Sequence, residues 1–182
     1  MNRIGILPIL SRIKIKMGFS PTNKTNKSQE KMPFAKVYIH FVWSTKNRVP
    51  YLNSPELRLA MWKHIRENAK KKEIYIDFIN GHKEHCHCLV SLGDDQTMRK
   101  IMQLIKGESS YWINKQNILK EKFEWQDEYF AVSVSESLVD KVRNYIKNQE
   151  SHHAHKTWEE EYNEFIEKYG FQKFNDTTNE LT

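Results

Sequence analysis

Histidine and cysteine alternate in the short segment His85-Cys86-His87-Cys88. The stretch from Lys83 to Leu92 is typical of a β-strand, and successive side chains of a strand point to opposite faces of its sheet. We therefore expect both imidazoles on one face and both thiols on the other. Two histidines on one face can share a metal ion, whereas a zinc site that uses all four side chains would need a β-bulge. The alternative is a half-exposed polar strand that binds no metal.

A second pair of candidate residues, Tyr145 and Gln149, lies four positions apart. Leu138, Val142 and Ile146 give this segment helical periodicity, so the pair should lie on one ridge of a helix, one turn apart. A phenol with a pKa of about 10 is a weak nucleophile at neutral pH, and it becomes competent if a nearby cation favours its phenolate or if the group it attacks is strongly polarised. A tyrosine beside an apolar stripe is more commonly a packing residue, and that interpretation stays open here.

The elements that must position these residues follow from hydrophobic periodicity and capping signals. Strands are predicted at residues 37–43, 74–79, 83–92 and 130–134, with the Asn80-Gly81 pair as the turn of a hairpin. Helices are predicted at residues 55–72, 98–113, 137–149 and 158–169. Their capping residues include Ser54, Ser137 with Asp140, Thr157 with Glu160, and Gly170. The order βαββαβ with appended C-terminal helices predicts an α+β protein with a ferredoxin-like, RRM-like antiparallel sheet.

The formal charge of +6 is unevenly distributed along the 182 residues. Residues 1–32 contain seven Lys or Arg and one acidic residue, residues 33–120 contain fifteen and eight, and residues 121–182 contain seven and fourteen. A basic half can follow nucleic-acid phosphates, although such asymmetry is also common as solubility patterning. We expect residues 1–32 to be a disordered basic extension, 33–174 a single folded domain and 175–182 a flexible tail.

Composition also excludes two classes of protein. No apolar run approaches the roughly 20 residues that span a bilayer, and the apolar stretch at residues 4–10 is a poor secretory signal. Cys86 and Cys88 are too close in the chain to form the disulfide framework of a small secreted domain. We therefore expect a cytoplasmic protein that does not enter the membrane.

Four stretches in this order carry a resemblance to a known family. They are Phe41-Val42-Trp43-Ser44-Thr45-Lys46-Asn47-Arg48, Gly81-His82-Lys83-Glu84-His85-Cys86-His87, Leu104-Ile105-Lys106-Gly107-Glu108-Ser109-Ser110 and Tyr145-Ile146-Lys147-Asn148-Gln149. Together they resemble the small single-tyrosine HUH transposases, the insertion-sequence-200-like family. The resemblance covers about Met32 to Gln149, and the acidic C-terminal helix after His152-His153 is similar to the REP-associated branch of that family.

The resemblance implies an active site and a reaction. His85 and His87 match the paired metal-binding histidines, Gln149 matches the third ligand, and Tyr145 matches the nucleophile. The implied enzyme is a DNA transposase that cuts and rejoins single-stranded DNA at element ends through a 5′-phosphotyrosine, with Mg²⁺ or Mn²⁺ as cofactor. Cys86 replaces the usual bulky aliphatic residue of the motif, and Glu84 stands where the family often has Asp, which leaves the role of Glu84 open.

The resemblance also implies partners. The expected substrate is single-stranded DNA with hairpin ends, and the expected assembly is a homodimer, with the sharing of sites between subunits left open. Lys46, Arg48, Lys100 and Lys106 are the candidate DNA-binding residues. Trp43 or Tyr38 could stack on bases, although core packing is the commoner role of such an aromatic.

Two functions from other classes compete with this one. A catalytically silent nucleic-acid-binding regulator of the same fold would not need Tyr145, His85, His87 and Gln149 together. A zinc-binding interaction module built on the His-Cys-His-Cys segment conflicts with the alternation of side chains along a strand.

Overall fold

The structure is a computed structural model that describes residues 35–171, and the expected extension at 1–32 and tail at 175–182 lie outside the described residues. The strands are β1 (Val37–Ser44), β2 (Tyr75–Gly81), β3 (His85–Leu92) and β4 (Phe130–Val134). The helices are α1 (Pro55–Lys71), α2 (Met98–Lys115), α3 (Val139–Lys147), α4 (Gln149–His152) and α5 (Trp158–Tyr169). Short 3-10 turns occupy Lys46–Arg48 and Glu136–Leu138.

The four strands form one sheet in the order β2-β3-β1-β4, and all its neighbours are antiparallel. Because β1 and β3 are the central strands, β3 and its two histidines lie in the middle of the sheet. The chain order βαββαβ with this strand order is the predicted ferredoxin-like α+β fold, and the prediction is confirmed.

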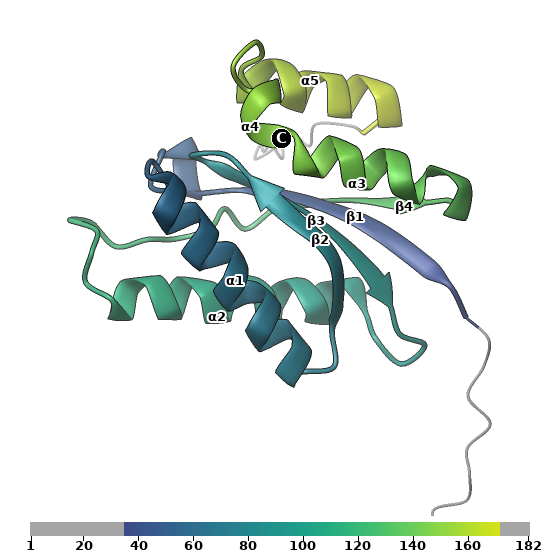
Figure 1. The fold of residues 1–182 in the computed structure, drawn as a ribbon, viewed down its shortest axis with the longest axis horizontal. Coiled ribbons are helices and arrows are strands. Elements are labelled where there is room, and N and C mark those ends of the chain that lie inside the picture. Colours follow the sequence, from purple (N-terminus) through teal and green to yellow (C-terminus); the bar gives the residue numbers. More distant parts are fainter. Residues whose placement is uncertain (1–34, 172–182) are drawn as a thin grey trace, which may run out of the picture. The chain divides into compact units, whose positions relative to one another are not determined.

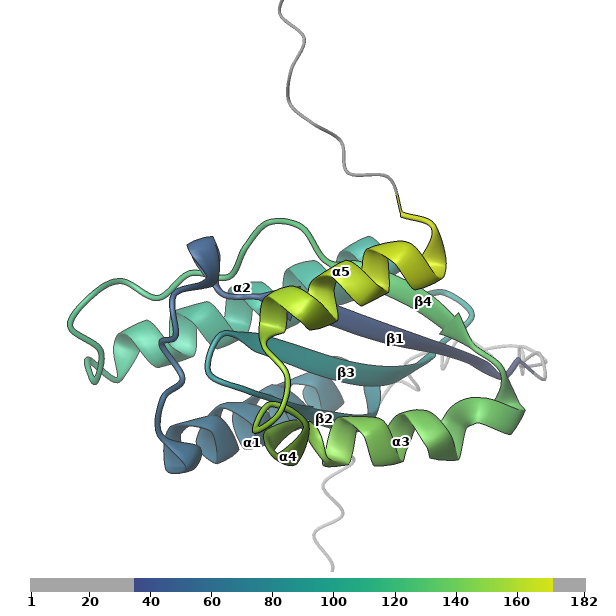
Figure 2. The ribbon, with the colours of Figure 1, turned by 90° about the horizontal axis from the view of Figure 1, so that it is seen from above.

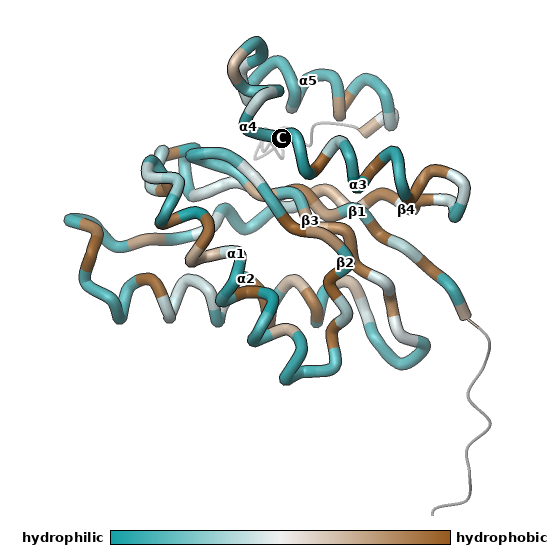
Figure 3. Tube along the Cα trace, viewed as in Figure 1, coloured by the Kyte–Doolittle hydropathy of each residue, from teal (hydrophilic) through white to brown (hydrophobic). Residues whose placement is uncertain are grey.

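Helices cover both faces of the sheet (Figures 1 and 2). The long helices α1 and α2 pack on one face around the main core, which includes Phe41, Trp43, Met61, Ile105 and both cysteines. The other face carries α3, α4 and α5, with two smaller clusters around Val42 and Leu89. Figure 3 shows the apolar residues concentrated on the strands and on the helix sides that face them. The sheet thus separates a dry core from a second, more polar layer.

Several helix boundaries agree with their capping signals. The Ser54 side chain accepts a hydrogen bond from the Leu57 amide, next to Pro55 at the first helical position of α1. Thr157 and Glu160 form the expected capping box of α5, and Gly170 ends that helix with a left-handed φ of 63°.

The predicted hairpin turn at Asn80-Gly81 is wrong. Both residues belong to β2, where they pair with His87 and Cys86, and residues 82–84 form the turn instead. Tertiary contacts explain the difference: Asn80 donates hydrogen bonds to the carbonyls of Ile146 and Lys147, and a Cβ at Gly81 would lie 2.2 Å from the His85 carbonyl oxygen. Gly81 therefore allows the two strands to approach closely, and Asn80 holds the end of α3, so neither residue forms a turn.

The helix predicted at residues 137–149 also differs from expectation, both where it starts and where it ends. Ser137 does not cap it, because the residue lies within the 3-10 turn and α3 begins at Val139. Asp140 instead pairs with Arg143. The helix then ends at Lys147, so Tyr145 lies on α3 whereas Gln149 begins the separate helix α4 after a break at Asn148. None of the helices within residues 35–171 has the length and apolar character needed to cross a membrane.

Candidate metal and tyrosine site

Strand β3 presents its four alternating side chains as the sequence predicted. Cys86 and Cys88 are buried in the core under α1 and α2, where they are free thiols. His85 and His87 point to the opposite face and are also completely buried. Burial raises the pKa of both thiols well above its ordinary value, so they stay protonated and apolar in character. The imidazoles therefore lie on the face covered by α3, α4 and α5, whereas the thiols lie in the apolar core on the other face.

Helix α3 is fastened to strand β2, and this attachment places Tyr145. The Asp77 carboxylate accepts hydrogen bonds from the Arg143 Nε and Nη2 atoms at 2.9 and 2.6 Å. One turn later, the Asn80 side chain satisfies two of the last carbonyls of α3. Val139 and Ile146 bury the apolar side of the helix against Leu89 of β3. With three attachments along nine residues, α3 holds the Tyr145 ring 5.5 Å from the His87 ring.

Gln149 reaches the same place from α4. Its side chain is fully buried, and its Oε1 atom lies 3.3 Å from His85 Nε2. The break at Asn148 between α3 and α4 does not separate the pair, because Tyr145 and Gln149 both contact a third residue, Glu161. The structure therefore brings together all four residues that the sequence nominated: His85, His87, Tyr145 and Gln149.

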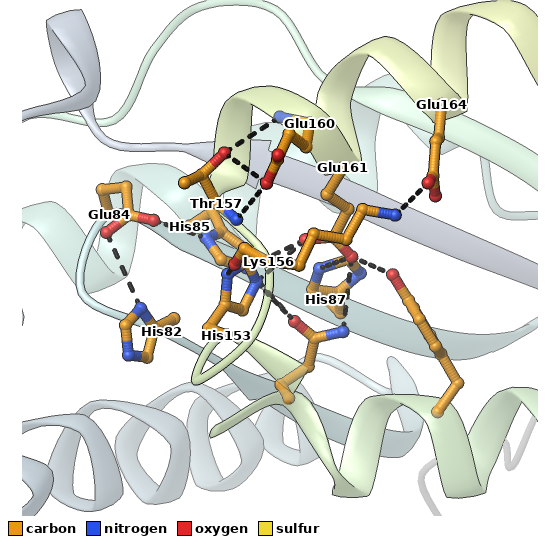
Figure 4. Close-up of polar contacts among 12 residues, drawn as sticks. His82, Glu84, His85, His87, His153, Lys156, Thr157, Glu160, Glu161 and Glu164 are labelled. Carbon is orange, nitrogen blue, oxygen red and sulfur yellow. Dashed lines mark hydrogen bonds and ion pairs between the residues drawn. The ribbon is translucent and has the colours of Figure 1, made fainter. Parts of the chain in front are cut away.

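Glu161 of α5 is the centre of this cluster, and sequence reasoning missed it (Figure 4). Its side chain is 1% exposed. Its Oε1 atom accepts a hydrogen bond from the Tyr145 hydroxyl and lies 3.4 Å from His87 Nε2, and its Oε2 atom lies 3.6 Å from His85 Nε2. Burial raises the pKa of this carboxyl to about 7. A signal was present in the sequence: Glu161 is three residues after Trp158 and four before Phe165, on the buried stripe of α5, where an acidic residue is unexpected.

His153 is the second residue that sequence reasoning missed. Its Nε2 atom lies 2.9 Å from Glu161 Oε2 and 3.1 Å from Gln149 Oε1, while its Nδ1–H donates to the Lys156 carbonyl at 2.9 Å. Burial, together with the nearby His85, lowers the pKa of His153 to about 4, so the ring is neutral at pH 7. His85, His153 and Glu161 offer ligand atoms within 4.8 Å of one another, a group that could hold a metal ion.

The two strand histidines have fixed orientations. His85 Nδ1 lies 3.1 Å from the Glu84 carboxylate, and Trp158 of α5 stacks on its ring at 4.3 Å. His87 Nδ1 lies 3.1 Å from His40 Nε2 on the neighbouring strand β1. Because each Nδ1 has a partner outside the cluster, each Nε2 faces into it, as is usual for metal-binding histidines. Burial lowers the pKa of His87 well below its ordinary value, which also favours the neutral ring.

Two buried atoms at the centre have no hydrogen-bond partner among the described residues, namely His87 Nε2 and Glu161 Oε2. The second of these is only 2.9 Å from His153 Nε2 but lacks hydrogen-bond geometry. Buried polar atoms are rarely left unpaired in folded proteins, and each such atom costs stability unless something satisfies it. An ion bound between these atoms would satisfy both, so the residues present fit a divalent metal.

The four candidate DNA-binding residues are dispersed. Lys46 and Lys106 meet at Asp127, the first through its carboxylate at 3.2 Å and the second through its backbone carbonyl at 2.8 Å. Arg48 lies over the Tyr162 ring of α5, 4.9 Å from its centroid. Lys100 lies in the first turn of α2, the helix that also carries Lys106.

The two aromatic residues that could have stacked on bases have packing roles. Trp43 is 1% exposed and packs edge-on against Trp125 in the main core. Tyr38 packs against the cluster under α3. Trp43 therefore has the core role that the sequence left as one of its two options.

Comparisons with known proteins agree on one family. The family model described as "Transposase IS200 like" matches residues 33–149. A structure described as a transposase from Deinococcus radiodurans aligns with a TM-score of 0.53 and 21% identity, over 64% of this chain and 93% of that one. The structure of a REP-associated tyrosine transposase bound to a REP hairpin aligns with a TM-score of 0.51 and 18% identity, over 69% and 74%. A comparison with curated proteins finds no match.

Proposed function

Because the chain belongs to the IS200-like transposase family, we propose that it cuts and rejoins single-stranded DNA through a covalent bond between Tyr145 and a 5′ phosphate. One observation carries the proposal. The Tyr145 hydroxyl contacts the same buried carboxylate as the donor atoms of His87 and Gln149. A nucleophile and a set of metal-ligating groups thus lie within one cluster, on a fold shared with transposases.

The metal would be held by His85, His87 and Gln149, whose imidazole nitrogens and amide oxygen suit Mn²⁺ or Mg²⁺. When bound, a divalent ion supplies Lewis acidity to a non-bridging oxygen of the scissile phosphate. The protein residues supply the orientation. Glu84 and His40 fix the two rings through their Nδ1 atoms, so both Nε2 atoms point into the cluster, where the ion would be held.

In the cleavage step, the Tyr145 oxygen attacks phosphorus and the bond from phosphorus to the 3′ oxygen breaks. The phenol gives up its proton, for which Glu161 is the adjacent acceptor, and the departing 3′ oxygen takes up a proton to become a hydroxyl. The products are a 5′-phosphotyrosine and a free 3′-hydroxyl. Attack of another 3′-hydroxyl on the phosphotyrosine reverses these changes and rejoins DNA, so no external energy source is needed.

The proposed substrate is single-stranded DNA that carries a hairpin, in line with the REP hairpin named for one of the structural neighbours. Lys46, Arg48, Lys100 and Lys106 remain the proposed phosphate contacts, and all four are exposed or half-buried. A homodimer remains the proposed assembly.

The test is the formation of a covalent adduct. Wild-type protein, Tyr145→Phe and the control Tyr111→Phe are incubated with end-labelled hairpin-bearing single strands and Mn²⁺, then separated under denaturing conditions. Tyr111 is an exposed tyrosine on α2, on the other side of the sheet. We expect a labelled protein band for wild type and the control and none for Tyr145→Phe. An adduct that persists in Tyr145→Phe would place the nucleophile elsewhere, and binding without any adduct in wild type would favour the silent DNA-binding regulator.

A further inference from the structure

The segment after Gln149 lies outside the part of the chain that the family model matches, yet it supplies two of the residues at the centre of the site. Glu161 comes from α5 and His153 from the turn before it. Both side chains are almost completely enclosed. A buried carboxylate is costly unless a cation or several hydrogen bonds compensate it, so this arrangement requires an explanation.

We propose that Glu161 and His153 are further ligands of the metal ion, which makes the C-terminal segment a structural part of the metal centre. This inference rests on the proposed function, because it concerns the same ion. It changes the ligand set from His85, His87 and Gln149 to five residues, among which the ligand atoms of His85, His153 and Glu161 lie within 4.8 Å of one another.

The spacing of the donor atoms supports this assignment. His153 Nε2 lies 2.9 Å from Glu161 Oε2 and 3.1 Å from Gln149 Oε1, and His85 Nε2 lies 3.3 Å from the same amide oxygen. Ligands about 2.1 Å from one ion are about 3.0 Å apart at octahedral angles and about 3.4 Å apart at tetrahedral angles. These separations, together with the 3.6 Å between His85 Nε2 and Glu161 Oε2, lie close to the spacing that one ion would impose.

The donors and acceptors around His153 and His85 support the same assignment independently. A neutral imidazole has one N–H, and in His153 that hydrogen is on Nδ1, where it bonds to the Lys156 carbonyl. The Nε2 lone pair then faces two oxygen atoms that carry lone pairs of their own, on Gln149 and Glu161. His85 repeats the pattern, with Nδ1 at the Glu84 carboxylate and Nε2 toward the same two residues. Lone pairs that face one another at these distances repel unless a proton or a metal cation lies between them, and a metal ion can serve all of these atoms at once.

The same carboxylate links the ion to the nucleophile. Its Oε2 atom is the one near His85 and His153, whereas its Oε1 atom accepts the Tyr145 hydrogen bond. As a ligand, Glu161 would fix the distance between the metal and the phenol oxygen. Because three imidazoles join one carboxylate and one amide, the set favours Mn²⁺ over Mg²⁺, which prefers oxygen ligands.

The test measures metal binding rather than activity. Free Mn²⁺ is followed by its electron paramagnetic resonance signal in titrations of the full chain, for wild type, Glu161→Gln and His153→Ala. Each variant has a matched control: Glu164→Gln changes an exposed acid one turn further along α5, and His155→Ala changes an exposed histidine two residues after His153. Melting temperatures with and without Mn²⁺ verify folding and give a second readout of binding.

We expect Glu161→Gln and His153→Ala to weaken Mn²⁺ binding at least about 10-fold, since even the loss of a residue that only orients a ligand costs about 10- to 100-fold. Their Mn²⁺-induced rise in melting temperature should shrink, while both controls match wild type. Unchanged or tighter Mn²⁺ binding in Glu161→Gln would overturn the inference and make Glu161 a competitor of the ion. If His85→Ala abolishes binding at the same time, the proposed function survives that failure. A wild type that neither binds Mn²⁺ nor forms an adduct would remove both.

Discussion

Glu84 has a role that its position in the sequence left open. It lies at the end of the tight turn before β3, and its longer side chain reaches the Nδ1 atom of the residue that follows it. The pKa of Glu84 is lowered, because the hydrogen bond and charge of His85 outweigh the opposing effect of burial. The acid is therefore ionised at neutral pH and holds His85 in the tautomer whose Nε2 can bind a metal.

A contrast between neighbouring residues tests the two faces of β3. We expect His85→Ala or His87→Ala to reduce cleavage by at least about 100-fold, since the loss of an outer partner alone costs about 10- to 100-fold in metal sites. Cys86→Val and Cys88→Ala should keep activity, because both thiols lie in the core under α1 and α2. Cleavage of a labelled hairpin strand is the measurement.

Folding must be verified for the cysteine variants, since a cavity or an overpacked side chain in the core can cost about 1–3 kcal/mol. A folded Cys86→Val or Cys88→Ala variant that loses activity as completely as the histidine variants would favour a mixed Cys/His zinc site.

At the scale of elements, the turn between β2 and β3 determines where His85 stands. Gly81→Ala should destabilise the protein by about 1–3 kcal/mol, because a Cβ would lie 2.2 Å from the His85 carbonyl oxygen and the backbone must move. The same movement should weaken Mn²⁺ binding. Chemical denaturation and a metal titration measure the two effects.

Gly107→Ala is the matched control for this substitution. Gly107 lies inside α2 with no atom within 4 Å of an added Cβ, so alanine should raise the free energy of unfolding by about 0.5–1 kcal/mol through helix propensity. A Gly81→Ala variant as stable as wild type, with normal metal binding, would show that the β2–β3 turn does not position His85.

The sequence predicted elements well wherever local signals and tertiary packing agree. Ser54 and Pro55 start α1 as their capping signal predicts. The alternation of β3 separates imidazoles from thiols, because the register that buries the cysteines in the main core is the one that the sequence pattern predicts. Predictions failed where a residue serves a distant element. Asn80-Gly81 is a turn signal by composition, but Asn80 is needed by the end of α3.

The same reasoning explains what was missed at the site. His85, His87, Tyr145 and Gln149 were found because short motifs contain them. Glu161 and His153 reach the site only through the packing of α5 over β3, which the spacing of residues does not reveal. The only sequence signal for the burial of Glu161 was its position on an otherwise apolar stripe. That signal is weak, because Glu161 is one of five acidic residues in α5.

At the scale of the molecule, every candidate catalytic residue comes from one chain. His85 and His87 from β3, Tyr145 from α3 and Glu161 from α5 meet without a second copy. We therefore expect that mixing Tyr145→Phe with His85→Ala does not restore adduct formation, since neither chain contains both a nucleophile and a complete ligand set. Denaturing electrophoresis of the mixture with labelled DNA is the measurement. Recovery of the adduct in the mixture would mean that the two sites exchange their tyrosine helices in a dimer.

The charge distribution leads to a further prediction about the whole chain. A protein that begins at Met32 lacks all seven basic residues of positions 1–32 but retains all of residues 33–149, which match the family model. It should cleave hairpin DNA like the full chain and bind a scrambled strand more weakly. The difference should shrink as salt rises, because each neutralised phosphate of a single strand contributes about 0.7 to the slope of log affinity against log salt.

Binding of both proteins to a hairpin-bearing and a scrambled strand, measured over a salt series, decides this question. A shortened protein that is insoluble, or that fails to cleave the hairpin, would place residues 1–31 within the functional unit and move the domain boundary.

The burial of the site has a consequence for how tightly DNA can bind. His85, His87 and Gln149 have no exposed surface, and Glu161 has 1%, so a phosphate cannot touch them while α5 stays where it is. Under the proposed function, DNA must select a minor population in which α5 has shifted enough to admit a phosphate while Glu161 stays beside Tyr145. Each tenfold decrease in the fraction of open protein lowers the apparent affinity for DNA tenfold, which is about 1.4 kcal/mol of binding free energy. Weak binding of the intact protein to its correct substrate would then reflect the equilibrium between closed and open states, and not a poor fit between protein and DNA.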